Sequence, residues 1–194
     1  MDHGGEQGEK KGEDKEGMRE LDHDGMNDGS GDMASDMLMA NGEYFDERFI
    51  DTMVPHHQAA VEMAKVALEN AEHREIRTLA EDIVAAQEAE IAQLQLIKKE
   101  EFGTSEVPIS MSAGEMEAMG MTIEPQELAE QKPFDKAFID NMIPHHESAI
   151  EMANVALENS ANPDIREIAR AIVEAQDKEI AQMEGWREGW YSEG

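Results

Sequence analysis

Two adjacent histidines flanked by methionines occur twice in this chain, and their side chains are the ones best suited to chemistry. Each copy reads Met-x-x-His-His followed, after five further residues, by another Met. The residues concerned are Met53, His56, His57, Met63, Met142, His145, His146 and Met152. Imidazole nitrogen and thioether sulfur are both metal donors. The repeated motif therefore predicts a metal-binding protein.

The donor types indicate which metal is preferred. The chain has 15 methionines and no cysteine, which excludes disulfides, zinc-thiolate sites and thiol catalysis. Thioether with imidazole favours copper, as Cu(I) through sulfur or Cu(II) through imidazole, with silver as a chemical mimic. Zinc remains an alternative through the histidines alone, but it has no use for the methionines. Thioethers also remain soft donors in oxidising surroundings, where thiols pair or oxidise.

A structural interpretation of the same residues is also open. Methionine on an apolar helix face usually fills space in a core, and one buried histidine is commonly a hydrogen-bonded structural residue. Here two histidines and two methionines recur together in both copies, while nearby positions such as Thr52 and Asn141 differ. This joint retention favours the metal-binding interpretation.

The formal net charge of −29 indicates which kinds of partner the protein can bind. Such a surface attracts cations and disfavours nucleic acid or anionic lipid as a partner. No apolar run is long enough to span a bilayer, so we expect no membrane insertion. The chain carries no signal peptide, and we expect that one has been removed from the mature protein.

The chain divides into four segments. Residues 1–42 are rich in glycine and charge and predict a disordered acidic tail that also contains methionines. Residues 43–101 and 133–194 are two copies of one sequence, and such duplication predicts one fold for both. Residues 102–132 form a methionine-rich crossover between them.

Each copy predicts two amphipathic helices. Apolar residues recur every three or four positions from Phe49 to Leu68, and again from Ile76 to Ile97. We expect the first helix of each copy to end at Asn70 or Asn159. Two such hairpins with matching apolar faces predict an all-α, ferritin-like four-helix bundle, with residues 102–132 as its long crossover.

Two groups of residues outside the motif have open interpretations. Four polar residues, Gln87, Glu90, Gln176 and Glu179, lie on the apolar stripes of the second helices. They either hydrogen-bond the histidine rings or flank the stripe and reach solvent. Four methionines lie close together in the crossover: Met111, Met116, Met119 and Met121. They form either a second copper site or part of a short helix that covers the bundle end.

The long motif has a recognisable resemblance. Phe-Ile-Asp-x-Met-[Val/Ile]-Pro-His-His-x-x-Ala-[Val/Ile]-Glu-Met-Ala, followed by Gln-x-x-Glu-Ile, resembles the domain-of-unknown-function 305 family over residues 45–100 and 134–190. The resemblance implies a ferritin-like four-helix fold, a periplasmic or secreted location and, for some members, copper binding and resistance. It also implies that the two Met-His-His-Met groups are ligands.

The family pattern has a further methionine after Glu-Ile, often with a tryptophan beyond it. The second copy keeps these residues as Met183 and Trp186, whereas the first copy has Leu94 and Ile97. The resemblance therefore adds Met183 to the predicted ligands. It also implies that the second copy is the better equipped of the two.

These observations predict a copper-binding protein of the cell envelope that sequesters or carries the metal and is not an enzyme. A carrier would hand copper to a partner protein, and the sequence does not predict an oligomeric state. No nucleophile-base motif or phosphate-binding loop is present in the sequence. The alternatives are a ferritin-like di-iron oxidase, which requires inward carboxylates, and a metal-free structural or dimerisation bundle.

Overall fold

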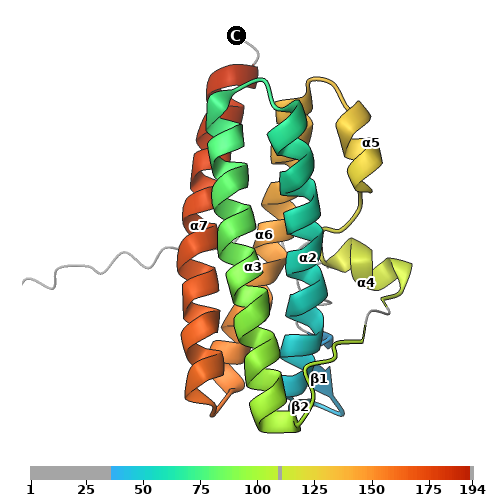
Figure 1. Ribbon diagram of the computed structural model, residues 1–194, viewed down its shortest axis with the longest axis vertical. Coiled ribbons are helices and arrows are strands. Elements are labelled where there is room, and N and C mark those ends of the chain that lie inside the picture. Colours follow the sequence, from blue (N-terminus) through green and yellow to red (C-terminus); the bar gives the residue numbers. More distant parts are fainter. Residues whose placement is uncertain (1–35, 109–110, 193–194) are drawn as a thin grey trace, which may run out of the picture.

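A bundle of four long helices makes up most of the computed structural model, which describes residues 36–108 and 111–192. The helices are α2 (Asp46–Asn70), α3 (Arg74–Phe102), α6 (Phe134–Asn159) and α7 (Pro163–Tyr191). Each sequence copy forms one helical hairpin, α2 with α3 and α6 with α7 (Figure 1). The predicted all-α bundle of two duplicated hairpins is confirmed.

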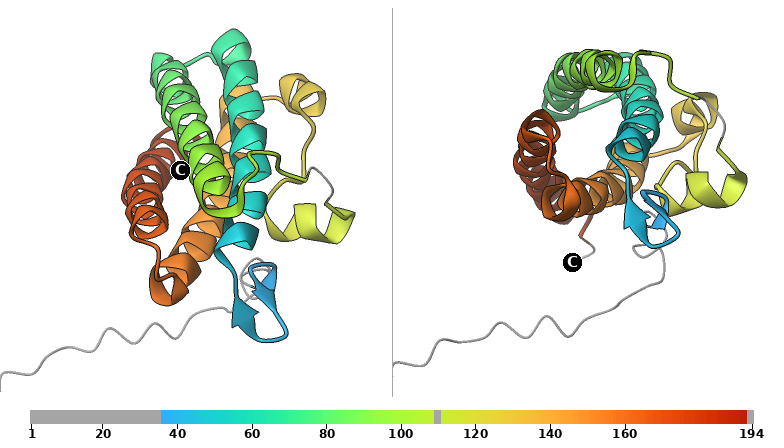
Figure 2. Two further views of the ribbon diagram at one scale, coloured as in Figure 1. Left: turned by 60° about the horizontal axis from the view of Figure 1, so that its bottom comes forward. Right: turned by 90° about the horizontal axis from the view of Figure 1, so that it is seen from below.

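The helices form a ring in which every neighbouring pair is antiparallel (Figures 1 and 2). Besides the contacts within the hairpins, α2 packs against α6 and α3 packs against α7. The long connection from α3 to α6 runs the length of the bundle, so α6 descends beside the ascending α2. One long crossover of this kind is the ferritin-like arrangement.

The helix ends follow from local sequence. α2 and α6 end at Asn70 and Asn159, as the sequence predicts. The side chain of Asn162 accepts hydrogen bonds from two free backbone N–H groups at the start of α7, while proline occupies the first position of this helix. At the end of α3, Gly103 has a φ of 79°, a left-handed conformation that glycine adopts without steric cost.

The interior consists of two apolar clusters at opposite halves of the bundle. The first includes Phe49 and Met53 of α2, and the second includes Ala60 and Met63 of the same helix. Every long helix is divided in this way, so between the clusters each helix contributes polar residues. A buried polar layer therefore crosses the bundle near its middle.

The crossover and the segment before α2 cover the outside of the bundle. The crossover contains two short helices, α4 (Ala113–Ala118) and α5 (Pro125–Glu130), and α5 packs against both α2 and α6. A two-residue antiparallel pair, β1 (Met39–Ala40) with β2 (Glu43–Tyr44), precedes α2. One sequence interpretation expected a short helix over the bundle end, whereas the two short helices of the crossover lie along the side of the bundle (Figure 1).

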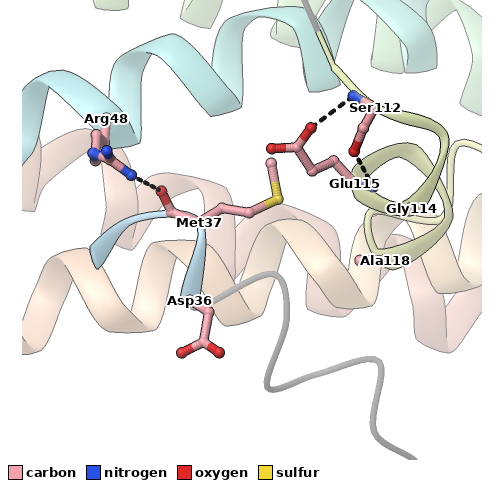
Figure 3. A pocket seen from close by; sticks show the side chains of 7 residues that line it. All are labelled: Asp36, Met37, Arg48, Ser112, Gly114, Glu115 and Ala118. Carbon is pink, nitrogen blue, oxygen red and sulfur yellow. Dashed lines mark hydrogen bonds between the residues drawn. The ribbon is translucent and has the colours of Figure 1, made fainter. Parts of the chain in front are cut away.

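The predicted tail is shorter than 42 residues. Residues 36–42 enter the β1–β2 hairpin, and Leu38 is fully buried in the first apolar cluster. Arg48 of α2 donates to the Met37 carbonyl oxygen, across a pocket that Ser112 and Glu115 of the α4 capping box also line (Figure 3). The tail prediction was wrong for these residues because Leu38 and Met37 pack against the bundle and Arg48 also donates to the Met39 carbonyl oxygen. Residues 1–35 lie outside the described part of the chain.

Candidate metal centre

Four imidazoles occupy the middle of the bundle and form what we call the histidine layer: His56, His57, His145 and His146. All four are completely buried. They come from α2 and α6, which lie side by side in antiparallel orientation, so the two copies of the motif meet at the same height. The structure therefore joins the histidines of both copies in one layer.

The central contact of the layer is between the two copies. The ring centroids of His56 and His145 lie 3.7 Å apart, with a tilt of 36° between the rings. Each of these rings lies 6.2 Å from its own neighbour, His57 or His146. The first histidines of the two pairs thus face each other, while the second histidines reach the other two helices of the bundle.

Carboxylates of α3 and α7 contact the outer histidines. His146 donates from Nε2 to Glu179 at 2.7 Å, because a carboxylate can only accept. His57 Nε2 lies 2.8 Å from a Glu90 oxygen, although this contact is not aligned as a hydrogen bond. The predicted hydrogen bond to a histidine ring is confirmed for Glu179, whereas Glu90 contacts its ring without one.

The two glutamines on the apolar faces of α3 and α7 behave differently from the glutamates. Gln87 and Gln176 are buried rather than solvent-exposed. Their side-chain oxygens have no hydrogen-bond partner among the described residues. The prediction that the two glutamines hydrogen-bond the rings is therefore not supported for these oxygens, which are buried acceptors without a donor among the described residues.

Ser148 makes the two central histidines unequal. Its Oγ lies 2.8 Å from His56 Nε2 and within 3.0 Å of two acceptors, the carbonyl oxygens of Met119 and His145. Ser148 has one hydroxyl hydrogen, which it donates to one of these carbonyl oxygens. Its Oγ therefore accepts a hydrogen bond from His56, and His56 donates from Nε2. The corresponding position of the first copy is Ala59. Neither ring nitrogen of His145 has a hydrogen-bond partner in the part of the chain that the structure describes.

The sequence carried a signal for this residue that the prediction missed. Ser148 lies one helical turn after His145, and therefore on the same helix face. It is also one of the positions at which the two copies differ, with alanine in the first copy. A polar substitution one turn from a buried histidine marks a hydrogen-bonding position.

A free nitrogen on every ring is the main chemical feature of the layer. The Nδ1 atoms of all four histidines are buried without a hydrogen-bond partner among the described residues. For His56 and His146 the proton is on Nε2, so Nδ1 carries a lone pair. Buried lone pairs that no donor satisfies are unfavourable by about 1–3 kcal/mol each. A metal ion would satisfy them, and a carboxylate on the far nitrogen is a common partner of metal-binding histidines.

Burial keeps the central imidazoles neutral. Desolvation, followed by the electrostatic effect of His57, lowers the pKa of His56 well below its usual value. Desolvation, followed by the effect of His56, likewise lowers the pKa of His145. Both rings are therefore uncharged at neutral pH and can ligate a cation without first losing a proton.

The lowered pKa values predict that the apo protein loses stability in mild acid. The unfolded chain protonates these two histidines near pH 6.5, while the folded protein does not, so the free energy of unfolding falls as pH drops below 6.5. Two such groups give a slope of about 3 kcal/mol per pH unit. Urea unfolding of apo protein at pH 7.0 and 5.5 measures it. The His56→Gln/His145→Gln variant should show a flatter profile, and equal profiles would contradict the assignment.

The predicted methionine ligands lie on both sides of the layer. Met53 and Met152 belong to the first apolar cluster, whereas Met63, Met142 and Met183 belong to the second. All five are at most 3% exposed. The two methionines of one motif copy therefore lie in different clusters, and each cluster combines methionines from both copies.

The crossover closes the outside of the layer beside α6. Gly120 has a φ of 66°, and a Cβ atom there would lie 2.7 Å from the backbone nitrogen of His145. The neighbouring Met119 is fully buried, and its carbonyl oxygen accepts from Ser148. No sequence pattern predicts that the crossover reaches the central histidine. Only glycine permits this approach.

Histidine, aspartate and glutamate side chains alone do not form a metal site here. In the described ranges, 36–108 and 111–192, no three of them are grouped to hold a metal ion, and this includes the four histidines of the layer. In the same residues no helix is long and apolar enough to cross a membrane. Glu90 and Glu179 contact the outer imidazoles, and the buried thioethers belong to the apolar clusters on both sides of the layer.

The family model described as the domain of unknown function DUF305 matches residues 1–98 and 98–187. This chain belongs to the DUF305 family. The resemblance found in the repeated motif is therefore confirmed. No curated protein matches the chain.

Solved structures of similar sequence include several metal-bound ones. CopM in its Cu(I)-bound form is 34% identical, with 77% of this chain and 100% of that chain covered and a TM-score of 0.68. CopM in its Cu(II)-bound form is 35% identical over 77% and 99% of the two chains, with a TM-score of 0.71. A DUF305 protein of Streptomyces coelicolor, described as secreted, is 26% identical over 71% and 89%, with a TM-score of 0.60.

Proposed function

We propose that this DUF305 protein binds copper in the histidine layer and acts as a sequestering or carrier protein. The observation that carries the proposal is the set of four buried imidazoles with unpartnered Nδ1 atoms. Buried thioethers lie on both sides of these rings. Neutral imidazole together with thioether suits Cu(I), and the imidazoles alone can also hold Cu(II).

The structural relatives support the same chemistry. CopM has been crystallised with Cu(I), Cu(II) and silver, and Ag(I) resembles Cu(I) in its preference for soft donors. We further propose an extracytoplasmic location, supported by the secreted relative from Streptomyces coelicolor. A strongly acidic chain would concentrate cations there. The proposed role is binding without catalysis.

The di-iron oxidase is less well supported. Ferritin-like di-iron sites use Glu-x-x-His pairs on inward faces, whereas the residues three positions before His56 and His57 are Met53 and Val54. Glu90 and Glu179 do face the layer, but each lies against a histidine nitrogen. Iron-dependent oxygen consumption by the purified protein would favour the oxidase over the copper protein.

A titration with Cu(I) in competition with a chromophoric chelator tests the proposal. We expect tight uptake by the apo protein, and no uptake would contradict the proposal. In the Glu90→Gln/Glu179→Gln variant the affinity should fall roughly 10- to 100-fold, because the far nitrogens lose their carboxylates. Glu88→Gln/Glu174→Gln, two exposed changes on the same helices, is the matched control and should bind as the parent does.

A further inference from the structure

A second group of methionines lines a pocket on the outer face of α2. The pocket has a volume of about 430 Å³ and lies between α2 and the crossover. Four thioethers contribute to its lining, and they are Met63, Met111, Met116 and Met121. One comes from the second motif position of α2, and three come from the crossover. The polypeptide thus brings together sulfur atoms that are far apart in sequence.

Core packing explains only part of this group. Met63 is almost fully buried in the second apolar cluster. Met111 and Met121 are half-buried against the first cluster, and Met116 is half-buried and belongs to neither cluster. Methionine has no packing advantage on a short, polar segment that is half-exposed. Three such residues directed into one pocket point to a use for their sulfur atoms.

The charge at the pocket favours a cation. Glu62 and Glu124 also line it, and both are exposed. No lysine, arginine or histidine lines the pocket. Carboxylates and thioethers therefore share the lining, and Glu62 also lies 3.5 Å from Lys65. Soft donors without thiolate or imidazole select a soft monovalent ion.

The position of the pocket connects it with the histidine layer. Pro55 and Ala59, which flank His56 along α2, line the pocket from the inner side. Met63 belongs both to this lining and to the apolar cluster that borders the layer. The pocket therefore lies directly outside the layer, and its other methionines come from the crossover.

We propose that this pocket is a second metal site, in which thioethers of Met63, Met111, Met116 and Met121 bind Cu(I) or Ag(I). Three of its donors, Met111, Met116 and Met121, come from the crossover and are not among the predicted ligands of the histidine layer, whereas Met63 is common to both groups. It deepens the proposed copper function by giving the crossover methionines a role.

The test uses full-length protein labelled with ¹³C at the methionine methyl groups, titrated with Ag(I) and followed by NMR. We expect the four pocket resonances to shift together, in the wild-type protein and in a His56→Ala/His57→Ala/His145→Ala/His146→Ala variant. If these resonances stay fixed while other methionines shift, the pocket site is wrong. If the histidine changes leave metal affinity unaltered, the layer is wrong but the pocket stands.

A matched pair of variants measures the stoichiometry. Met111→Leu/Met116→Leu/Met121→Leu preserves side-chain volume, so folding should be retained, and it should lose one equivalent of bound Ag(I). The control, Met18→Leu/Met26→Leu/Met33→Leu, removes the same number of thioethers from the N-terminal tail and should lose none. Equal loss in both variants, or no loss in the first, would overturn the proposal.

Discussion

Changing His56, His57, His145 and His146 together to alanine is expected to lower Cu(I) affinity by more than about 100-fold. Loss of a residue that only orients a ligand costs roughly 10- to 100-fold, and this variant removes the proposed nitrogen ligands themselves. The variant removes all four buried rings of the layer. No imidazole of the layer therefore remains to bind the metal. The affinity is measured by competition with a chromophoric Cu(I) chelator.

His73→Ala is the matched control for the histidine variant. The ring of His73 stacks on Trp190 and its Nδ1 lies 2.6 Å from Asp135, away from the layer. We expect this change to leave copper affinity as it is. Because four truncations leave cavities, helical content is checked by circular dichroism. If the variant does not fold, the pairs His56→Ala/His145→Ala and His57→Ala/His146→Ala replace it, and unchanged affinity in both would contradict the copper site.

Changing Gly120 to alanine is expected to destabilise the protein by about 2–5 kcal/mol. A left-handed backbone costs a residue with a Cβ about 1–2 kcal/mol, and forcing extra atoms into a packed site costs a further 1–3 kcal/mol or so. The Cβ would lie 2.7–2.9 Å from backbone atoms of Pro144 and His145, which cannot swing aside as a flexible side chain can. Urea unfolding measures the change.

Gly103→Ala separates the two contributions. Gly103 also has a positive φ, 79°, but a Cβ there meets no atom within 4 Å. We therefore expect it to cost only the left-handed conformation, about 1–2 kcal/mol. If Gly120→Ala were no more destabilising than Gly103→Ala, the crossover would not be packed against α6 as described.

The long helices and their pairing into hairpins could be predicted because their determinants are local or repeated. The apolar stripe that begins at Phe49 recurs in the second copy. Helix ends at Asn70 and Asn159 follow from the same comparison. The glutamates at the layer were predicted because Glu90 and Glu179 interrupt an otherwise apolar helix face. Because the sequence is duplicated, the helices and their ends could be predicted from two copies of the same pattern.

Features that arise from tertiary contacts could not be predicted. The close contact between the His56 and His145 rings requires α2 and α6 to be neighbours, and no sequence pattern in either helix predicts this. The approach of Gly120 to His145 depends on the path of the crossover, in which glycine has many other uses. Leu38 was assigned to the tail because the short apolar run from Met37 to Ala40 gives no helical periodicity within a polar segment.

The division of methionines between the two apolar clusters has the same origin. Met53 and Met63 belong to one motif, yet the layer separates them along α2. Their positions relative to Met142 and Met152 follow from the antiparallel packing of the copies. A helical wheel of one copy shows only that all of them face inward.

X-ray absorption at the copper edge, on protein loaded with one equivalent of Cu(I), tests the central claim most directly, because it identifies the atoms bound to the metal. We predict a first shell that contains imidazole nitrogen together with thioether sulfur, and the loss of the imidazole signal in the four-histidine variant. A shell of sulfur alone in the wild-type protein would contradict the claim and place the first copper among the methionines outside the histidine layer.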